Sequence, residues 1–131
     1  MASTLGTPPV LRAVSDPTTS YVEPTIHIKT ADFPRVAVQF AFTKTDGTSF
    51  EWYYEWSEDG TTWYRTANIA TSAGTSTATA QEYTFVAATA NLTELLWVAG
   101  NFFRVYVKRT GGAATNTVGI KATRLRVAGA F

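Results

Sequence analysis

Two long segments of the chain alternate between apolar and polar residues. Residues 35–43 place valines and phenylalanines on one face, and residues 49–57 place one phenylalanine, two tryptophans and Tyr54 on one face. Alternation with a period of two over this length is typical of half-buried β-strands. Further strands are expected at residues 25–30, 61–68, 81–88, 101–109 and 115–127. The pattern predicts an all-β protein, a single antiparallel β-sandwich of about seven strands and of jelly-roll or Ig-like type.

The turn between the two long strands can be tested against this pattern. A two-residue turn at Asp46-Gly47 would place apolar and polar residues on the same face. A three-residue loop, residues 45–47, would instead pair Phe42 with Phe50 and Phe40 with Trp52. The sequence therefore predicts a hairpin that carries an aromatic ladder, and Gly112 predicts a similar turn between the last two strands.

Two segments depart from the alternation. Residues 91–100, NLTELLWVAG, have helix-like leucine spacing and are expected to form at most a short crossover turn. Residues 69–80, IATSAGTSTATA, contain mostly small residues with little to pack, and they are expected to form a mobile loop.

The first 24 residues are expected to form an extended, proline-rich arm, followed by the β-sandwich domain at residues 25–131. Four of the five prolines fall in this arm, and proline cannot donate to a sheet ladder. The arm also carries the apolar residues Leu5, Val10, Leu11, Val14 and Tyr21. These residues are too many for a solvated tail, so the arm is expected to lie on its own domain or on a neighbouring subunit.

The composition favours contact with other proteins. Only 16% of the 131 residues are charged, the formal net charge is +1, and cysteine is absent. The lack of cysteine excludes thiol catalysis, disulfides and thiolate metal sites. The weak net charge and the lack of a recognition motif argue against nucleic-acid binding, and no apolar run is long enough to predict a membrane span.

Acidic residues predominate in the first sixty positions and basic residues in the rest. This asymmetry is consistent with acidic and basic strands side by side in one sheet, or with head-to-tail complementarity between copies.

The residues that could take part in catalysis do not predict an enzyme, and no metal or cofactor is expected. His27 is the only histidine, it lies in an alternating strand pattern, and no nucleophile motif accompanies it. Glu51 and Glu55 share a strand face but would be about 13 Å apart, too far for a glycosidase pair. Asp59 precedes Gly60 in a turn, and the turn explains it without a metal ion.

Two strand faces are candidate sites. The first carries Phe102, Arg104, Tyr106 and Lys108, and interleaved aromatic and arginine residues are typical of protein interfaces. With the arm residues, this face forms the predicted interface. The second carries Glu51, Tyr53 and Glu55, where aromatic rings and carboxylates could bind a sugar.

Trp63 and Arg65 join this second face in one register of the next hairpin. In the other register, Trp63 packs against Trp56 in the core. The second register is favoured because an indole gains more from burial than from exposure.

The segment Ser57 to Trp63 has the form S-x-D-G-x-x-W, and residues 102–112 read FFRVYVKRTGG. With the proline-rich arm, these features resemble small β-sandwich structural proteins of tailed-bacteriophage virions, of the capsid decoration or tail-associated class. The resemblance implies a non-enzymatic protein of the decoration or cement type that stabilises a shell. It implies capsid or other virion proteins as partners, a homo-oligomer, and location in the virion, with the host cytoplasm as the place of assembly. The alternative is a carbohydrate-binding β-sandwich module.

Overall fold

The computed structural model describes residues 8–126, which form eleven strands and no helix. The strands are β1 (Val10–Ser15), β2 (Ile28–Lys29), β3 (Arg35–Thr43), β4 (Ser49–Ser57), β5 (Tyr64–Arg65), β6 (Ala67–Ser72), β7 (Thr75–Ala80), β8 (Tyr83–Val86), β9 (Ala90–Trp97), β10 (Phe102–Thr110) and β11 (Thr117–Leu125). All strand pairings are antiparallel, and the sheets do not close into a barrel. The all-β prediction is confirmed.

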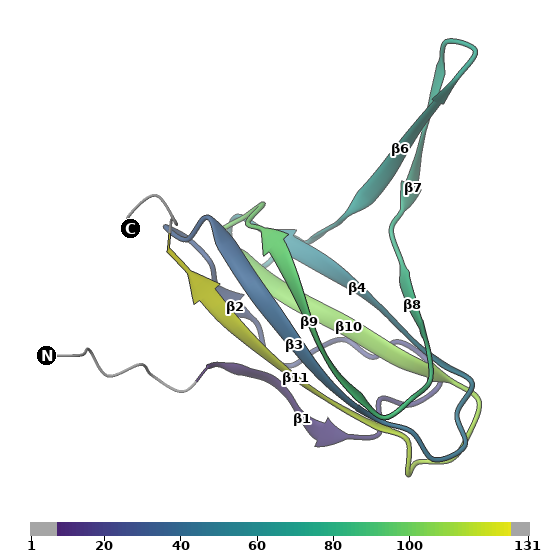
Figure 1. Cartoon of the computed structure of the whole chain (residues 1–131). Helices are drawn as coiled ribbons and strands as arrows, with labels where there is room; N and C mark the ends of the chain where they lie inside the picture. The colour runs from purple at the N-terminus through teal and green to yellow at the C-terminus, as the bar shows by residue number, and fades with distance from the viewer. Residues whose placement is uncertain (1–7, 127–131) are drawn as a thin grey trace, which may run out of the picture.

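The strands form two main sheets and a separate ribbon (Figure 1). Sheet A has the order β1-β11-β3-β9. Sheet B has the order β2-β10-β4-β5, and β8 also pairs with β4. Strands β6 and β7 pair only with each other and project from the rest of the molecule (Figure 1).

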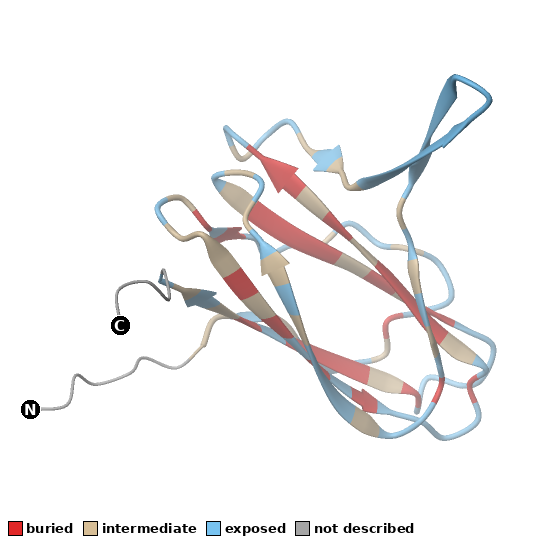
Figure 2. Ribbon diagram, turned by 45° about the horizontal axis from the view of Figure 1, so that its top comes forward, coloured by how far each residue is buried: buried red, intermediate tan, exposed pale blue. Residues whose placement is uncertain are grey.

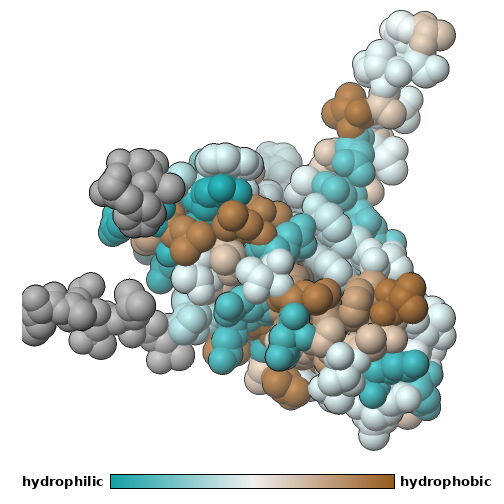
Figure 3. Space-filling view, in the orientation of Figure 1, coloured by the Kyte–Doolittle hydropathy of each residue, from teal (hydrophilic) through white to brown (hydrophobic). Residues whose placement is uncertain are grey.

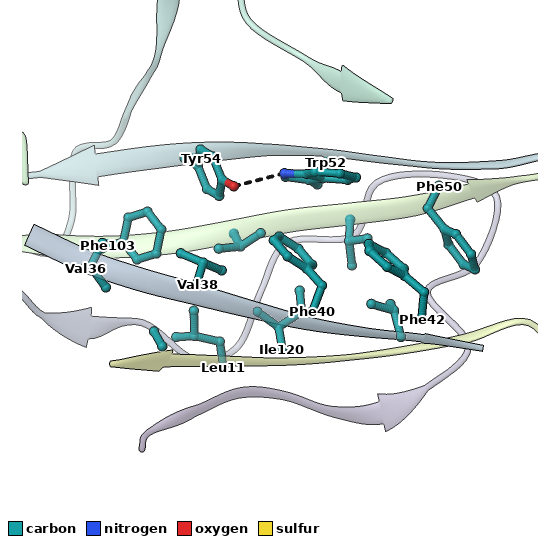
Figure 4. Close-up of a cluster of buried hydrophobic side chains, with 14 of the residues drawn as sticks. Leu11, Val36, Val38, Phe40, Phe42, Phe50, Trp52, Tyr54, Phe103 and Ile120 are labelled. Carbon is teal, nitrogen blue, oxygen red and sulfur yellow. Dashed lines mark hydrogen bonds between the residues drawn. The ribbon is translucent and has the colours of Figure 1, made fainter. Parts of the chain in front are cut away.

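The core lies between sheets A and B, where the buried segments of their strands face one another (Figure 2). All eight apolar residues that the alternation placed on the inner faces of β3 and β4 are buried: Val36, Val38, Phe40, Phe42, Phe50, Trp52, Tyr54 and Trp56. Aromatic rings of the two strands meet across the core (Figure 4). The ring centroids are 4.7 Å apart for Phe42 and Phe50 and 4.8 Å apart for Phe40 and Trp52. The predicted faces are therefore confirmed.

The predicted hairpin is wrong, although its aromatic contacts form. Strand β3 belongs to sheet A and β4 to sheet B, so residues 44–48 cross from one sheet to the other. Phe42 and Phe50 therefore meet through the core and not as neighbours along a ladder. The turn at Gly112 is corrected in the same way, because β10 lies in sheet B and β11 in sheet A. Alternation fixes which face a side chain occupies, but not which strand lies beside it.

Asn116 ties these two crossovers together from a fully buried position. Its Oδ1 accepts hydrogen bonds from the backbone N–H groups of Thr45, Asp46 and Gly47 at 2.9, 3.2 and 2.8 Å. Its Nδ2 donates to Asp46 Oδ1 at 2.6 Å and to the carbonyl of Ala113 at 2.8 Å. One side chain thus provides hydrogen-bond partners for backbone groups in both connections between the sheets at this end of the molecule.

The first 24 residues differ from the expected arm. Residues 1–7, with Leu5, lie outside the described residues. Val10–Ser15 form strand β1, which pairs with β11 with two register shifts. The predicted extended conformation without a ladder applies only after β1, from Asp16 onward.

Two further expectations of secondary structure are wrong. Residues 91–97 belong to strand β9, and residues 91–100 contain no helical turn. Leu92 and Leu96 occupy the same strand face as Phe40 and Val36, so a period of two underlies the leucine spacing. Residues 69–80 lie within the paired strands β6 and β7, which turn at Ala73-Gly74 with φ of 48° and 78°. Positive φ at both positions suits a tight hairpin.

Candidate functional site

The two predicted strand faces are one surface. In the pairing of β10 with β4, Arg104 lies opposite Glu55, Tyr106 opposite Tyr53 and Lys108 opposite Glu51. Directly opposed residues of an antiparallel pair point to the same side. The outer side of sheet B therefore combines both sets. We call this surface the sheet-B face: Glu51, Tyr53, Glu55, Trp63, Arg65, Phe102, Arg104, Tyr106 and Lys108.

On this surface, acidic residues from the first half of the sequence lie beside basic residues from the second half. Acidic β4 and basic β10 are neighbours in one sheet, and Arg104 forms an ion pair with Glu55 at 2.7 Å. Side-by-side strands therefore account for these charges.

The rings of the sheet-B face pack on one another. Tyr53 and Tyr106 stack with centroids 4.6 Å apart and an interplanar angle of 8°. The guanidinium of Arg65 lies over the Tyr53 ring at 3.7 Å, and the Tyr21 ring meets Tyr53 edge-on at 4.8 Å. Burial, together with the charge of Glu55, raises the pKa of Tyr53 to about 12. Tyr53 is thus held between other side chains of its own chain.

Trp63 lies on this outer face and not in the core. Strand β5 pairs Arg65 with Glu55 and Tyr64 with Trp56, which places Trp63 on the side of Glu55. Arg104 lies 4.2 Å over the Trp63 ring, and the His27 ring lies 5.4 Å away. The favoured register, with Trp63 against Trp56, is therefore wrong. The cation–π contact with Arg104 takes the place of core burial.

Residues 16–27, which we call the strap, cross this face. Near its start, Asp16 forms an ion pair with Arg109 at 2.8 Å, and the carbonyl of Thr18 accepts a hydrogen bond from the Arg109 N–H. In its middle, Glu23 forms an ion pair with Arg104 at 3.1 Å. At its end, the His27 ring meets Phe102 at 5.5 Å.

Tyr21 is the central contact of the strap. It lies against Tyr53 and Tyr106, beneath the ammonium of Lys108 at 4.9 Å, and its hydroxyl donates to Glu82 at 2.6 Å. Burial and the hydrogen bond to Glu82 raise the pKa of Tyr21 far above its usual value. Tyr21 therefore contacts the chain's own sheet-B face.

The acidic turn after β4 is a structural motif. Asp59 Oδ1 accepts hydrogen bonds from the N–H groups of Thr61 and Thr62, both at 2.8 Å, and from the Ser57 hydroxyl at 3.0 Å. The backbone hydrogen bonds of Thr62 and Thr61 hold the pKa of Asp59 below its usual value. Residues 8–126 contain no group of three His, Cys, Asp or Glu side chains that could share a metal ion.

The outer face of sheet A carries a shallow groove of about 600 Å³. Its floor includes Ala41 and Gly119, which lie opposite each other in the pairing of β3 with β11 and have almost no side chain. Val10 and Val14 of β1 line the groove. Leu11 points inward and belongs to the core. The predicted arm residues are therefore divided between the groove, the core and the sheet-B face.

Strand β9 forms one edge of sheet A, beside the groove. Leu95 is 47% exposed and Trp97 is 69% exposed. The Arg35 guanidinium lies 4.2 Å over the Trp97 ring. This surface was not predicted from the sequence, because the spacing of the leucines resembles that of a helical turn.

The ribbon of β6 and β7 is the most prominent projection (Figure 3). Every residue of both strands is exposed. No charged residue occurs between Arg65 and Glu82, and Ile69, 66% exposed, is the ribbon's one large apolar side chain. The sequence did carry a signal, since Thr alternates with Ser or Ala through residues 75–80.

No family model, curated protein or solved structure matches the chain. Among the described residues, none belongs to a helix with the length and apolar character needed to cross a membrane.

Proposed function

We propose that this protein is a non-enzymatic structural subunit that assembles on or with other capsid subunits and stabilises a shell, as decoration or cement proteins do. The resemblance at residues 57–63 and 102–112 supports the virion as its location, with assembly in the host cytoplasm and a homo-oligomeric state. The proposed fold type is a β-sandwich of jelly-roll or Ig-like type. Two sheets that share a core, joined by crossovers at β3–β4 and β10–β11, support it.

The ribbon is the observation that carries this proposal. An isolated two-stranded hairpin is at best marginally stable in water, because it buries little apolar surface. Here β6 and β7 extend from the domain with every residue exposed. A charge-free ribbon can contact another protein surface without the cost of desolvating a charge. Assembly would give this projection a partner.

The alternative function, carbohydrate binding, is less well supported. A sugar ring stacks on an open aromatic face. The Tyr53 ring has Arg65 on one side and Tyr106 on the other, and Arg104 lies over the Trp63 ring. The strap adds Tyr21 to the same cluster. A sugar would have to displace the chain's own side chains.

Excision of the ribbon tests the proposal. The N–H of Gln81 donates to the carbonyl of Thr66 at 2.8 Å, so an Asn-Gly turn can join these residues in place of residues 67–80. The free energy of unfolding is expected to change by less than about 1 kcal/mol, because no core residue is removed. Association between copies, measured by sedimentation across a concentration series, is expected to weaken at least tenfold.

Matched point variants accompany the excision. Ile69→Ser is expected to weaken association, whereas Val86→Ser, at a 77% exposed residue of neighbouring β8, should leave it unchanged. Unaltered association of the ribbon-deleted chain would overturn the proposal. So would a full chain that stays monomeric up to about 1 mM, the concentration that corresponds to only about 4 kcal/mol of binding energy.

A further inference from the structure

Strand β9 leaves one row of backbone groups unpaired. Within residues 8–126, β9 pairs with β3 on one side and with no strand on the other. The N–H of Val98 donates to the carbonyl of Pro34, one step beyond the pair of Trp97 with Arg35. Hydrogen-bonded and non-hydrogen-bonded pairs alternate along an antiparallel ladder. The N–H and C=O groups of Asn91, Thr93, Leu95 and Trp97 therefore point away from β3, toward the open edge.

This edge carries only one of the features that usually oppose strand pairing, the inward-pointing charge of Glu94, and that charge is engaged by the Tyr54 hydroxyl. Natural edge strands are short, bulged, or protected by lysine, proline or inward charges that oppose pairing. Strand β9 has eight residues, a register with β3 without interruption, and neither lysine nor proline. Its one charged residue, Glu94, points inward and accepts a hydrogen bond from the Tyr54 hydroxyl.

The other edges of the two main sheets are protected. Strand β1 has two register shifts against β11, and β2 and β5 have two residues each. Strand β8 has four residues. Strand β9 is thus the one long and regular edge among the described strands of sheets A and B.

We propose that β9 pairs in antiparallel fashion with β9 of a second copy of this chain, about a twofold axis, so that two copies of sheet A become one continuous sheet. This inference rests on the proposed function, because it names one surface through which the protein assembles. The side chains that accompany the open backbone groups are Asn91, Thr93, Leu95 and Trp97, which carry no charge. Two copies therefore meet without repulsion, whereas a charged partner strand would find no opposite charge in this row.

The inward position of Glu94 selects the register. An axis at Glu94 would set two carboxylates directly opposite each other, which is unfavourable. An axis at Leu95 places Leu95 beside its own copy and Thr93 beside Trp97 on both sides. This register covers the two most exposed apolar residues of β9 with apolar or β-branched neighbours.

The pair closes as a dimer. Each copy contributes the same edge, and the opposite edge of sheet A is interrupted by the register shifts of β1. In an isologous contact both copies use the same surface, here the β9 edge. After the two copies have paired, neither has another β9 edge with which to pair. The sheet therefore ends after two copies and does not extend into a fibre.

Single-cysteine variants of the full chain test the contact, and the natural sequence contains no cysteine that would interfere. In the proposed register, Leu95→Cys brings two Cα atoms to about 5.5 Å, a distance that a disulfide can span. Under mild oxidation this variant is expected to form a covalent dimer at least tenfold faster than Gln39→Cys. Gln39 is the matched control because it is exposed on the outer side of the same sheet, one strand away from the edge.

Charge at the edge gives a second readout. Leu95→Lys is expected to raise the dissociation constant of the dimer at least tenfold, whereas Gln39→Lys, with the same added charge, should change it less than twofold. Equal cross-linking of the two cysteine variants, or equal weakening by the two lysine variants, would overturn the pairing of β9. Excision of the ribbon leaves β9 intact, so the cross-link of Leu95→Cys is expected to persist in the ribbon-deleted chain even if the ribbon proposal fails.

Discussion

At the scale of the residue, Asn116 links the two connections that join the sheets at one end of the molecule. Its buried side chain accepts three hydrogen bonds from the N–H groups of residues 45–47 and donates two, to Asp46 and to the carbonyl of Ala113. The fit is close, because a Cβ added to Gly47 would lie 2.9 Å from Asn116 Oδ1. The sequence alone gave no reason to single out Asn116, because its value depends on two turns that meet only in the folded chain.

Asn116→Ala is expected to lower the free energy of unfolding by about 3 kcal/mol. The substitution leaves three buried or partly buried N–H groups without their acceptor, and each such loss costs roughly 1–3 kcal/mol before relaxation. Denaturant titration monitored by tryptophan fluorescence measures the change. Asn68→Ala, at an exposed position of β6, is the control and should cost less than about 0.5 kcal/mol. A loss below about 1 kcal/mol for Asn116→Ala would show that water replaces the amide.

At the scale of the element, the alternation of apolar and polar residues predicted correctly which side chains of a strand are buried. It did not predict which strands pair with each other. The inner residues of β3 and β4 were identified correctly, and even the contact of Phe40 with Trp52 was anticipated. The hairpin was wrong because residues that face each other across a core and residues that pair along a ladder give the same pattern. In β9, Leu92 and Leu96 face inward and Leu95 outward, and a helical period fits these three leucines equally well.

The candidate site shows the same limit. Both predicted faces consist of outward residues, as the alternation required, but only the pairing of β4 with β10 shows that they form one surface. The arm was expected to lie on its own domain or on a neighbouring subunit, but the face that residues 16–27 cover was not predicted, because a segment without periodicity does not indicate which strands it contacts. The sequence therefore identified the chemistry of the sheet-B face and missed the segment that occupies it.

Release of the strap is a prediction at this scale. The double variant Tyr21→Ala, Glu23→Ala removes the contacts with Tyr53 and Arg104. Amide protection in residues 16–27 is expected to fall roughly tenfold while β4 and β10 keep theirs, because local opening does not require loss of the core. The pKa of Tyr53 should also fall from about 12 toward the ordinary value, since burial is its main cause.

Hydrogen exchange measures the first effect and ultraviolet absorbance during a pH titration measures the second. Val22→Ala is the control because Val22 lies between the two residues and is exposed. Unchanged protection in the double variant would mean that the contacts at the two ends of the strap hold it, namely those of Asp16 and Thr18 with Arg109 and that of His27 with Phe102.

At the scale of the whole molecule, some surfaces are covered by the chain itself and others are open. The sheet-B face is occupied by the strap and by its own ion pairs. Among the described residues, the groove on sheet A, the β9 edge and the ribbon remain open. The ribbon carries no charge and β9 carries only Glu94, whereas Arg12 and Lys121 line the groove. Uncharged residues are therefore concentrated on the β9 edge and the ribbon, where contact with other copies is proposed.

The stability of the whole molecule is expected to fall steeply above about pH 10, the ordinary pKa of tyrosine. Burial, followed by the hydrogen bond to Glu94, raises the pKa of Tyr54 far above that value, and burial raises the pKa values of Tyr83 and Tyr106 as well. Above pH 10 the unfolded chain releases these protons while the folded chain keeps them. The folded state then binds more protons than the unfolded state, so its free energy of unfolding decreases as pH rises.

Tyr54→Phe isolates the largest of these contributions. The variant loses the hydrogen bonds to Trp52 and Glu94, so it should be less stable than the natural chain at pH 7. Its stability should nevertheless decline less steeply between pH 10 and 12, by up to about 1.4 kcal/mol per pH unit, which is the slope for one retained proton. Chemical denaturation at pH 7, 9, 10, 11 and 12 gives both slopes. Parallel curves would show that Tyr54 ionises in the folded state as readily as in the unfolded one, and that its place between the sheets admits water.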